Sequence, residues 1–199
     1  MRAVYHGLED IEALVGDISD AEKARADFGS YTREQYFEDL AKVTDYRVQG
    51  DMADLLVDGS RETMRWLKSQ GARFLPLYEW QFKLPDGRIR FSGGSAVECN
   101  GAGDGISAAL FAACERAGIP VHYETAAQSL CVNDAEEVTG VVAVRNGQRV
   151  VYHARRAVII TCGGYEYNVR MRKAFLDGPG KEGWAFYGSP ANTGDGIRM

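Results

Sequence analysis

Two glycine-rich stretches near the end of this 199-residue chain carry residue types that could hold a large ligand. The first is Thr161-Cys162-Gly163-Gly164, which follows a run of apolar residues and precedes an aromatic and acidic segment. Glycine has no Cβ, so a bulky ligand can approach the main chain closely at such a point. Taken alone, a Gly-Gly pair also fits a tight turn or the entry to a helix, and both interpretations stay open.

The second stretch combines amide, hydroxyl and carboxylate groups with two glycines, in the order Asn192-Thr193-Gly194-Asp195-Gly196. It precedes a predicted helix, and the free N–H groups at a helix start suit an anionic or electron-rich partner. The carboxylate could instead accept a hydrogen bond from a ligand. The alternative is a helix cap with no ligand.

A third stretch, residues 101–106 (GAGDGI), approaches the spacing of the dinucleotide-binding fingerprint. The position of the third glycine is Ile106, and no clear apolar strand directly precedes the stretch. The pattern therefore favours a loop that caps the helix after it, and a nucleotide-binding module is kept as an alternative.

The cysteines and histidines indicate no metal site. The cysteines lack a C-x-x-C pair, which excludes the usual zinc spacings and argues against a disulfide framework, so reduced thiols are expected. The three histidines are scattered, and a Ser/His/Asp or Cys/His site stays open without support from spacing. The residues concerned are Cys99, Cys114, Cys131, Cys162, His6, His122 and His153.

The composition is that of an ordinary globular protein, with 45% hydrophobic and 26% charged residues and a net charge of -5. No basic block is interleaved with aromatic residues, so nucleic acid is not expected as a partner. No apolar run reaches the roughly 20 residues that span a bilayer. The first ten residues lack the apolar core of a signal peptide, and the expected location is the cytoplasm.

The first half of the chain predicts helices followed by a hairpin. Thr32 and Gln35 have the spacing of a capping box, which predicts a helix over 32–43. A second apolar stripe predicts a helix over 51–70, ended by Gly71. Residues 72–91 then read as strand, turn and strand, with the turn at 85–87.

The second half predicts an α/β arrangement. A helix over 106–117 and a short strand over 119–124 precede a three-stranded excursion, in which Asn146-Gly147 indicates a type I′ hairpin turn. The run 157–161 is apolar without alternation, as is typical of a central strand covered on both faces. The predicted fold class is therefore α/β with an α+β excursion.

The order of these motifs resembles the fumarate reductase/succinate dehydrogenase flavoprotein family. There, a strand ending in A-T-G-G-[FY] is followed by T-G-D-G and a helix; here "AVIITCGGYEYN" precedes "NTGDGIRM". The stretches "YTREQYFEDLAKVT" and "DMADLLVDGSRETMRWLKSQGARFLP" look closest to the tricarballylate dehydrogenase-like members. The resemblance runs over essentially the whole chain.

The resemblance implies FAD as cofactor and hydride transfer between flavin N5 and a carbon next to a carboxylate in a di- or tricarboxylic acid. By this resemblance, the Thr161 and Asn192 stretches line the cofactor, and two alanines contact the adenine. A loop after two arginines resembles a stretch near the active site of relatives, although exposed hairpin charges are the simpler interpretation of those arginines. The implied cofactor-binding residues are Ala126, Ala127, Thr161, Cys162, Gly163, Gly164, Asn192, Thr193, Gly194, Asp195 and Gly196, and the implied substrate-binding residues are Arg88, Arg90, Ser92, Gly93 and Gly94.

Two parts of the family pattern are missing from these 199 residues. The N-terminal βαβ unit with its G-x-G-x-x-G turn is not seen, and the family's catalytic region lies beyond the T-G-D-G stretch. The expectation is therefore a fragment, namely a partial FAD-binding domain, with 1–91 a mainly helical segment plus hairpin and 92–199 its distal half. The incomplete sheet should leave the apolar residues at 158–160 either exposed or covered by a partner chain, and a homo-oligomer through this sheet is one form of such cover. The alternative is a folded remnant or interaction module without flavin; the electron partner is not identified.

Overall fold

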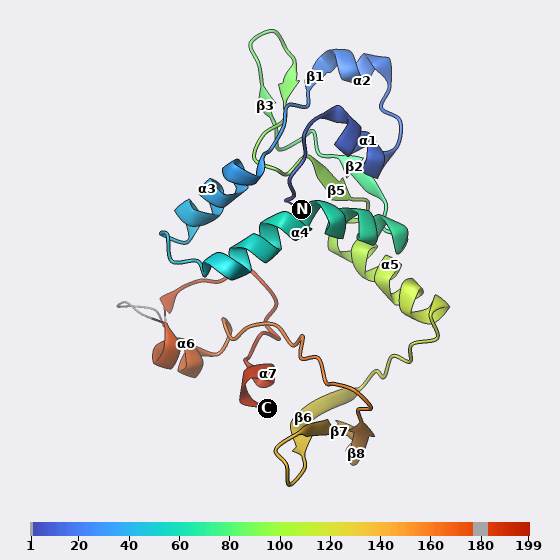
Figure 1. Cartoon of the computed structure of the whole chain (residues 1–199), viewed down its shortest axis with the longest axis vertical. Coiled ribbons are helices and arrows are strands. Elements are labelled where there is room, and N and C mark those ends of the chain that lie inside the picture. The colour runs from blue at the N-terminus through green and yellow to red at the C-terminus, as the bar shows by residue number, and fades with distance from the viewer. Residues whose placement is uncertain (1, 177–182) are drawn as a thin grey trace. The chain divides into compact units, whose positions relative to one another are not determined.

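A computed structural model describes residues 2–176 and 183–199, and it divides into two compact units, Met1–Val121 and His122–Met199 (Figure 1). The predicted boundary between residues 91 and 92 falls inside the first unit. In chain order, the elements are α1 (Leu8–Val15), α2 (Asp20–Arg25), β1 (Ala26–Asp27), α3 (Arg33–Val43), α4 (Gly50–Ser69), β2 (Phe74–Pro76), β3 (Phe82–Lys83), β4 (Ile89–Arg90), β5 (Val97–Cys99), α5 (Ala102–Arg116), β6 (Thr125–Val132), β7 (Val138–Arg145), β8 (Gln148–His153), α6 (Val169–Phe175) and α7 (Asp195–Arg198).

The two helices predicted in the first unit are confirmed. Thr32 and Gln35 form the capping box of α3, in which the Thr32 amide donates to the Gln35 side chain over 2.8 Å. Helix α4 runs along α3 and buries one stripe of its 20 residues, including Val57 and Met64 (Figure 1). Gly71 follows its last turn with a φ of 107°, a left-handed conformation that suits glycine.

The core of the first unit is built from aliphatic and aromatic side chains. Ile11 and Val57 are almost completely buried, and the rings of Phe28 and Phe91 stack with centroids 4.7 Å apart. Tyr78 meets Phe91 edge-on. These contacts join residues near the start of the chain to the loop that precedes residue 92.

The short strands of the first unit pair differently from the sequence prediction. The turn at 85–87 does connect β3 and β4, which are antiparallel, but β2 pairs with β5 and not with β3. Strand β4 also pairs in parallel with β1. The prediction considered only neighbours in sequence, whereas these strands find partners far away along the chain.

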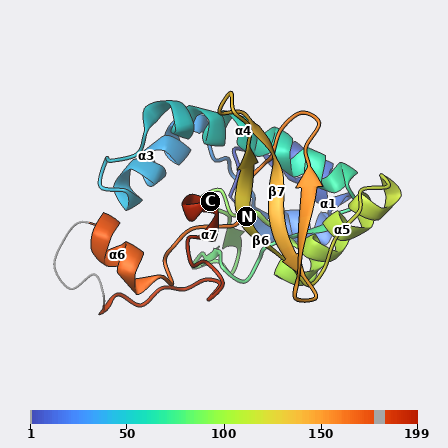
Figure 2. The same ribbon diagram turned by 90° about the horizontal axis from the view of Figure 1, so that it is seen from below.

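In the second unit, β6, β7 and β8 form an antiparallel sheet in that order, and β6 and β7 lie side by side (Figure 2). Asn146 and Gly147 have φ values of 50° and 77°, which confirms the predicted type I′ turn between β7 and β8. Sequence alternation and turn chemistry were sufficient to predict this hairpin.

Three local predictions in the second half are wrong. Residues 119–124 form no strand, and the next strand begins at Thr125. The run 157–161 is also irregular, because no neighbouring strand in the described chain pairs with it. The helix expected from Ile106 begins at Ala102.

The expected exposure of the 158–160 region is confirmed at two of its residues. Ile159 is 85% exposed and Ile160 is 43% exposed. Within the described residues, no helix is both long and apolar enough to cross a membrane.

Candidate functional site

The two predicted ligand-binding stretches of the second unit lie against each other. The Gly194 amide donates to the carbonyl oxygen of Gly164 over 3.0 Å, and the Tyr167 amide donates to the carbonyl oxygen of Asn192, also over 3.0 Å. The Asn168 side chain donates to the carbonyl oxygen of Thr193 over 2.8 Å. Residues 25 to 30 positions apart in sequence therefore form one local structure.

At 163 and 164, side chains of the chain itself occupy the space that a Cβ would take, and at 163 the backbone conformation also favours glycine. Gly163 has a φ of 75°, and a Cβ placed there would overlap the Oδ1 atom of Asn192. A Cβ at Gly164 would collide with the carboxylate of Glu166. Packing against Asn192 and Glu166 therefore accounts for these glycines, in addition to the predicted role in ligand binding.

The glycines of the second stretch are also closely packed. Gly194 is buried with a φ of 80°, and a Cβ on it would overlap the sulfur of Met171. A Cβ on Gly196 would meet Ile160 and would lie 3.1 Å from the Cβ of Cys162. Cys162 is therefore a contact between the two stretches, although its side chain is free and exposed.

Two carboxylates are held near this junction. Asp195 accepts from the Thr193 hydroxyl over 2.7 Å and pairs with Arg198, and these contacts, the Thr193 hydrogen bond foremost, lower the pKa of Asp195. Helix α7, which Asp195 begins, is only one turn long, so the helix-dipole part of the ligand prediction has little physical basis. Glu166 accepts from the Asn192 side chain, which lowers the pKa of Glu166.

The main chain of the first stretch is available to a ligand. The amides of Thr161, Cys162, Gly163 and Gly164 donate to no group in the part of the chain that the structure describes, and Thr161 to Gly163 are exposed. Unused donors beside side-chain-free backbone are what an oxygen-rich cofactor such as FAD needs from a wall of its site. The residues present therefore fit that cofactor.

The two alanines expected to contact adenine lie elsewhere in the second unit. Ala126 and Ala127 are in β6, opposite Val144 and Ala143 of β7, and both are exposed. They follow no strand, contrary to the sequence interpretation, because the predicted strand before them does not form. Their contact with the cofactor stays a prediction.

The arginines predicted to bind substrate are already paired. Arg88 donates to Asp86 over 2.8 Å, and Arg90 donates to Asp27 over 3.2 Å, with both arginine side chains more than half exposed. This arrangement agrees with the simpler interpretation, exposed hairpin charges. The glycine loop after them is held differently, since the Ser92 amide donates to the Gln81 side chain over 3.0 Å.

Arg2 is the cation that the structure places beside this loop. A Cβ built on Gly93 would lie 3.7 Å from a guanidinium nitrogen of Arg2, and the Ala3 amide donates to the Gly94 carbonyl over 3.1 Å. The guanidinium also lies over the ring of Tyr31, 5.7 Å from its centroid, and 3.4 Å from a carboxylate oxygen of Asp39. Sequence reasoning missed Arg2 because no local pattern connects it to residues 92–94.

An open groove of about 850 Å³ runs past the same loop. Its charged lining mixes Lys42 and Arg90 with several acidic residues, so it has no uniform positive potential. The groove is lined by Asp27, Gly29, Ser30, Tyr31, Glu34, Gln35, Glu38, Asp39, Lys42, Arg90, Phe91, Ser92 and Gly93.

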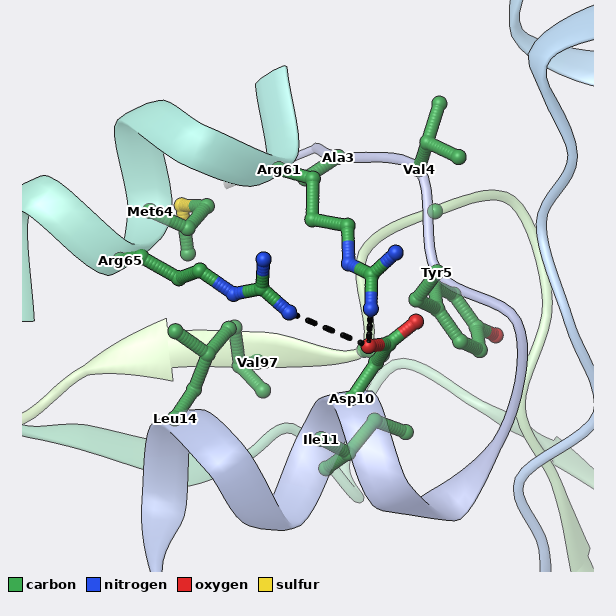
Figure 3. Close-up of a pocket in the computed structure, with 12 residues that line it drawn as sticks. Ala3, Val4, Tyr5, Asp10, Ile11, Leu14, Arg61, Met64, Arg65 and Val97 are labelled. Atoms are coloured by element: carbon green, nitrogen blue, oxygen red, sulfur yellow. Dashed lines mark hydrogen bonds and ion pairs between the residues drawn. The ribbon is translucent and has the colours of Figure 1, made fainter. Parts of the chain in front are cut away.

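A small pocket of the first unit is lined by an ion cluster of Asp10, Arg61 and Arg65. Figure 3 shows Arg61 and Arg65 of α4 reaching toward Asp10 of α1, and Arg65 comes within 3.7 Å of the Asp10 carboxylate. Asp10 also accepts from the His6 amide over 2.9 Å. The cavity measures about 30 Å³, which leaves room for about one water molecule and not for a substrate.

Stretch 101–106 shows no separate nucleotide site. Gly101 is the left-handed cap of α5, and residues 102–105 are the first turn of that helix. A Cβ on Gly105 would overlap the carbonyl oxygen of Asn100, which explains that glycine by packing. In the described residues, no group of three or more His, Cys, Asp or Glu side chains could hold a metal ion.

Together, the mixed α/β fold and the paired glycine stretches define part of a cofactor-binding domain. Comparison with protein families agrees, since the model of the family described as "FAD binding domain" matches residues 19–199. The chain belongs to that family, and FAD is the cofactor that the family implies.

Two of the curated relatives are named 3-oxosteroid 1-dehydrogenase. The chain is 37% identical over 103 residues to a 3-oxosteroid 1-dehydrogenase of Mycobacterium tuberculosis, covering 49% of this chain and 18% of that protein. It is 33% identical over 102 residues to the enzyme of the same name from Comamonas testosteroni, covering 51% of this chain and 16% of that protein. The chain thus spans less than a fifth of the length of these relatives.

Solved structures share the fold. A flavocytochrome c3 fumarate reductase in its open conformation matches with a TM-score of 0.70 at 22% identity, covering 100% of this chain and 31% of that one. The 3-ketosteroid Δ1-dehydrogenase of Sterolibacterium denitrificans matches with a TM-score of 0.66 at 19% identity, covering 88% and 44%. These likenesses confirm a partial FAD-binding domain; the finer assignment to tricarballylate dehydrogenase-like proteins finds no specific support in them.

Proposed function

We propose that this chain is part of an FAD-dependent oxidoreductase in which Thr161–Gly164 and Asn192–Gly196 form one wall of the cofactor site. The observation that carries the proposal is the junction of the two stretches, together with the unused amides of the first. FAD, when bound, supplies the hydride acceptor or donor at its N5 atom. The residues of the chain bind and orient the cofactor.

In this wall, the main chain does most of the binding. The amides of Thr161 to Gly164 donate to cofactor oxygens, while the space that side chains at 163 and 164 would fill is taken by Asn192 and Glu166. Asp195 is held ionised by the Thr193 hydroxyl and Arg198, which suits it to accept a hydrogen bond. The catalytic residues are expected outside these 199 residues.

For the substrate, we propose a small di- or tricarboxylic acid bound on the side of the 92–94 loop. Arg2 supports this class, because one edge of its guanidinium contacts Asp39 while another nitrogen lies beside Gly93. Arg88 and Arg90 stay candidates beside Arg2, since all three arginines contact an aspartate through one nitrogen.

A 3-oxosteroid is the second candidate substrate. The relatives named 3-oxosteroid 1-dehydrogenase favour it, at 33% to 37% identity over about half of the chain. The matched segment is a small part of those proteins. The match therefore supports a shared cofactor domain more strongly than a shared substrate site.

The experiment is to purify the protein as its gene encodes it and to measure its flavin content and activity. We expect stoichiometric FAD, identified by absorbance and by chromatography of the released cofactor. Dye reduction is then compared with tricarballylate, with succinate and with 4-androstene-3,17-dione. A colourless protein that takes up no FAD would contradict the proposal and favour an interaction module. Activity with the steroid alone would replace the carboxylic acid as substrate class.

The cytoplasmic location and self-association through residues 158–160 also stay proposals. Sedimentation of the purified protein at several concentrations tests the second. A concentration-independent monomer would contradict self-association.

A further inference from the structure

Glu166 and Asn192 form a side-chain pair that the sequence patterns did not indicate. The Asn192 side-chain nitrogen donates to one carboxylate oxygen of Glu166. The other carboxylate oxygen lies against Gly164, where it occupies the space of a missing Cβ. The contact with Asn192 lowers the pKa of Glu166, so the carboxylate is ionised at neutral pH and can only accept hydrogen bonds.

This pairing decides which way the Asn192 amide faces. An asparagine side chain has a donor end and an acceptor end, and the acceptor-only carboxylate selects the donor end. The acceptor end, Oδ1, is thereby turned against Gly163. The carbonyl oxygen of Asn192 is held as well, by the Tyr167 amide. Oδ1 receives no hydrogen bond from the described residues.

The polarity of the Gly163 turn follows from this arrangement. The backbone contributes donors, namely the unused amides of residues 161–164, and Asn192 contributes an acceptor beside them. With the amide reversed, the same place would present two more donors and no acceptor. The side chain of Glu166 therefore controls what hydrogen-bond pattern a ligand meets.

We infer that Glu166 is a positioning residue of the cofactor site, which orients Asn192 so that Oδ1 accepts a hydrogen bond from an N–H or O–H group of the bound cofactor. This inference rests on the proposed function for the ligand, but the pairing itself is independent of it. Glu166 contacts the ligand only through Asn192.

The test compares four variants in the protein as its gene encodes it, with FAD affinity measured by flavin fluorescence after removal and re-addition of the cofactor. Glu166→Ala should weaken FAD binding about tenfold, the effect of losing one well-placed hydrogen bond. Glu166→Gln should bind nearly normally, because its side-chain oxygen still accepts from Asn192. Asn192→Asp should bind poorly, since two carboxylates then meet.

The decisive variant is the double exchange Glu166→Gln with Asn192→Asp. There, glutamine donates and aspartate accepts, so an oxygen again faces Gly163 and FAD affinity should return to within about threefold of the unmodified protein. Such a recovery shows that the two side chains act as a pair, and urea unfolding of the same variants separates a change in FAD affinity from a change in stability. Glu136→Ala, at an exposed position of the same unit, is the matched control.

A second readout does not need the cofactor. In the protein stripped of FAD, the Asn192 side-chain NH₂ resonances should shift in Glu166→Ala and stay close to normal in Glu166→Gln. Failure of the unmodified protein to bind FAD would contradict the proposed function. Normal FAD binding by both Glu166→Ala and Asn192→Asp would overturn this inference alone.

Discussion

The amide of Gly194 donates a hydrogen bond to the carbonyl oxygen of Gly164 over 3.0 Å. This bond connects the middle of one glycine stretch to the end of the other. Because Gly194 is also buried against Met171, the junction depends on both main-chain geometry and side-chain packing. A change at Gly194 should therefore affect stability and cofactor binding together.

Gly194→Ala is expected to destabilise the second unit by about 2–4 kcal/mol, because alanine would be strained at a φ of 80° and its Cβ would overlap the Met171 sulfur. Chemical denaturation monitored by circular dichroism measures the change, and FAD affinity should fall with it. Gly183→Ala is the control, since a Cβ there meets nothing within 4 Å. Equal stability of the two variants would show that Gly194 tolerates a side chain.

Tyr5→Phe should leave the free energy of unfolding at pH 7 unchanged or raise it by up to about 1 kcal/mol. The Tyr5 hydroxyl is buried and has no hydrogen-bond partner in the described chain, so its removal costs no such bond. Tyr31→Phe is the control with the opposite result: the Tyr31 hydroxyl donates to Asp39 over 2.8 Å, and its loss should cost about 1 kcal/mol. Urea unfolding of both variants gives the comparison.

Tyr5 also predicts a loss of stability at alkaline pH. Burial, with a smaller effect of the Asp27 charge, raises the pKa of Tyr5 to about 12 in the folded protein, against about 10 when it is unfolded. The stability contributed by this shift is complete below pH 10 and declines as the pH rises through 12. Tyr5→Phe should lessen the decline in the free energy of unfolding between pH 10 and 12. If the variant and the unmodified protein lose stability equally over this range, the prediction is wrong.

Asp10→Asn is expected to destabilise the first unit by about 1–3 kcal/mol, because it leaves Arg61 and Arg65 without the carboxylate that they share. The Asp10 side chain is only 11% exposed, whereas the arginines are about 40% exposed and can be partly hydrated. Thermal unfolding measures the effect. Glu9→Gln, at the exposed neighbouring position, should be nearly neutral.

Arg2→Met should raise the KM for a carboxylic acid substrate about tenfold or more, with a smaller effect on kcat, if one charged hydrogen bond to the substrate is lost. Arg88→Met should change KM little, because Arg88 is exposed and paired with Asp86. Steady-state kinetics with the flavin-loaded protein separates the two. A larger effect of Arg88 than of Arg2 would support the assignment made from sequence.

The parts of the fold that follow local rules could be predicted from the sequence. The capping box at Thr32, the end of α4 at Gly71 and the hairpin at Asn146-Gly147 depend on residues a few positions apart, and all three form. The run 157–161 failed because a central strand needs neighbours, and its own apolar composition cannot supply them.

The candidate site also combines residues that local motifs indicated with residues that only the folded structure reveals. The sequence motifs pointed to the two glycine stretches, and the structure brings these stretches together. It could not indicate Arg2, whose relation to Gly93 depends on chain folding across many residues. Nor did it indicate Glu166, because an isolated glutamate after two glycines has no distinctive spacing. Pairings that are distant in sequence or specific to one side-chain orientation lie outside such patterns.

The contacts that join the start of the chain to residues near 94 also govern the order in which the first unit can be made. The Ala3 amide donates to the Gly94 carbonyl, and β1 pairs with β4. Neither contact can form until the ribosome has synthesised β4 and Gly94, which follow helices α3 and α4 in the chain. Closing such a long loop is slow compared with forming α3 or α4. On the ribosome, the nascent first unit should therefore hold its helices early and acquire its core only after residues 89–99 have emerged, an interval in which a chaperone has access to its apolar surface.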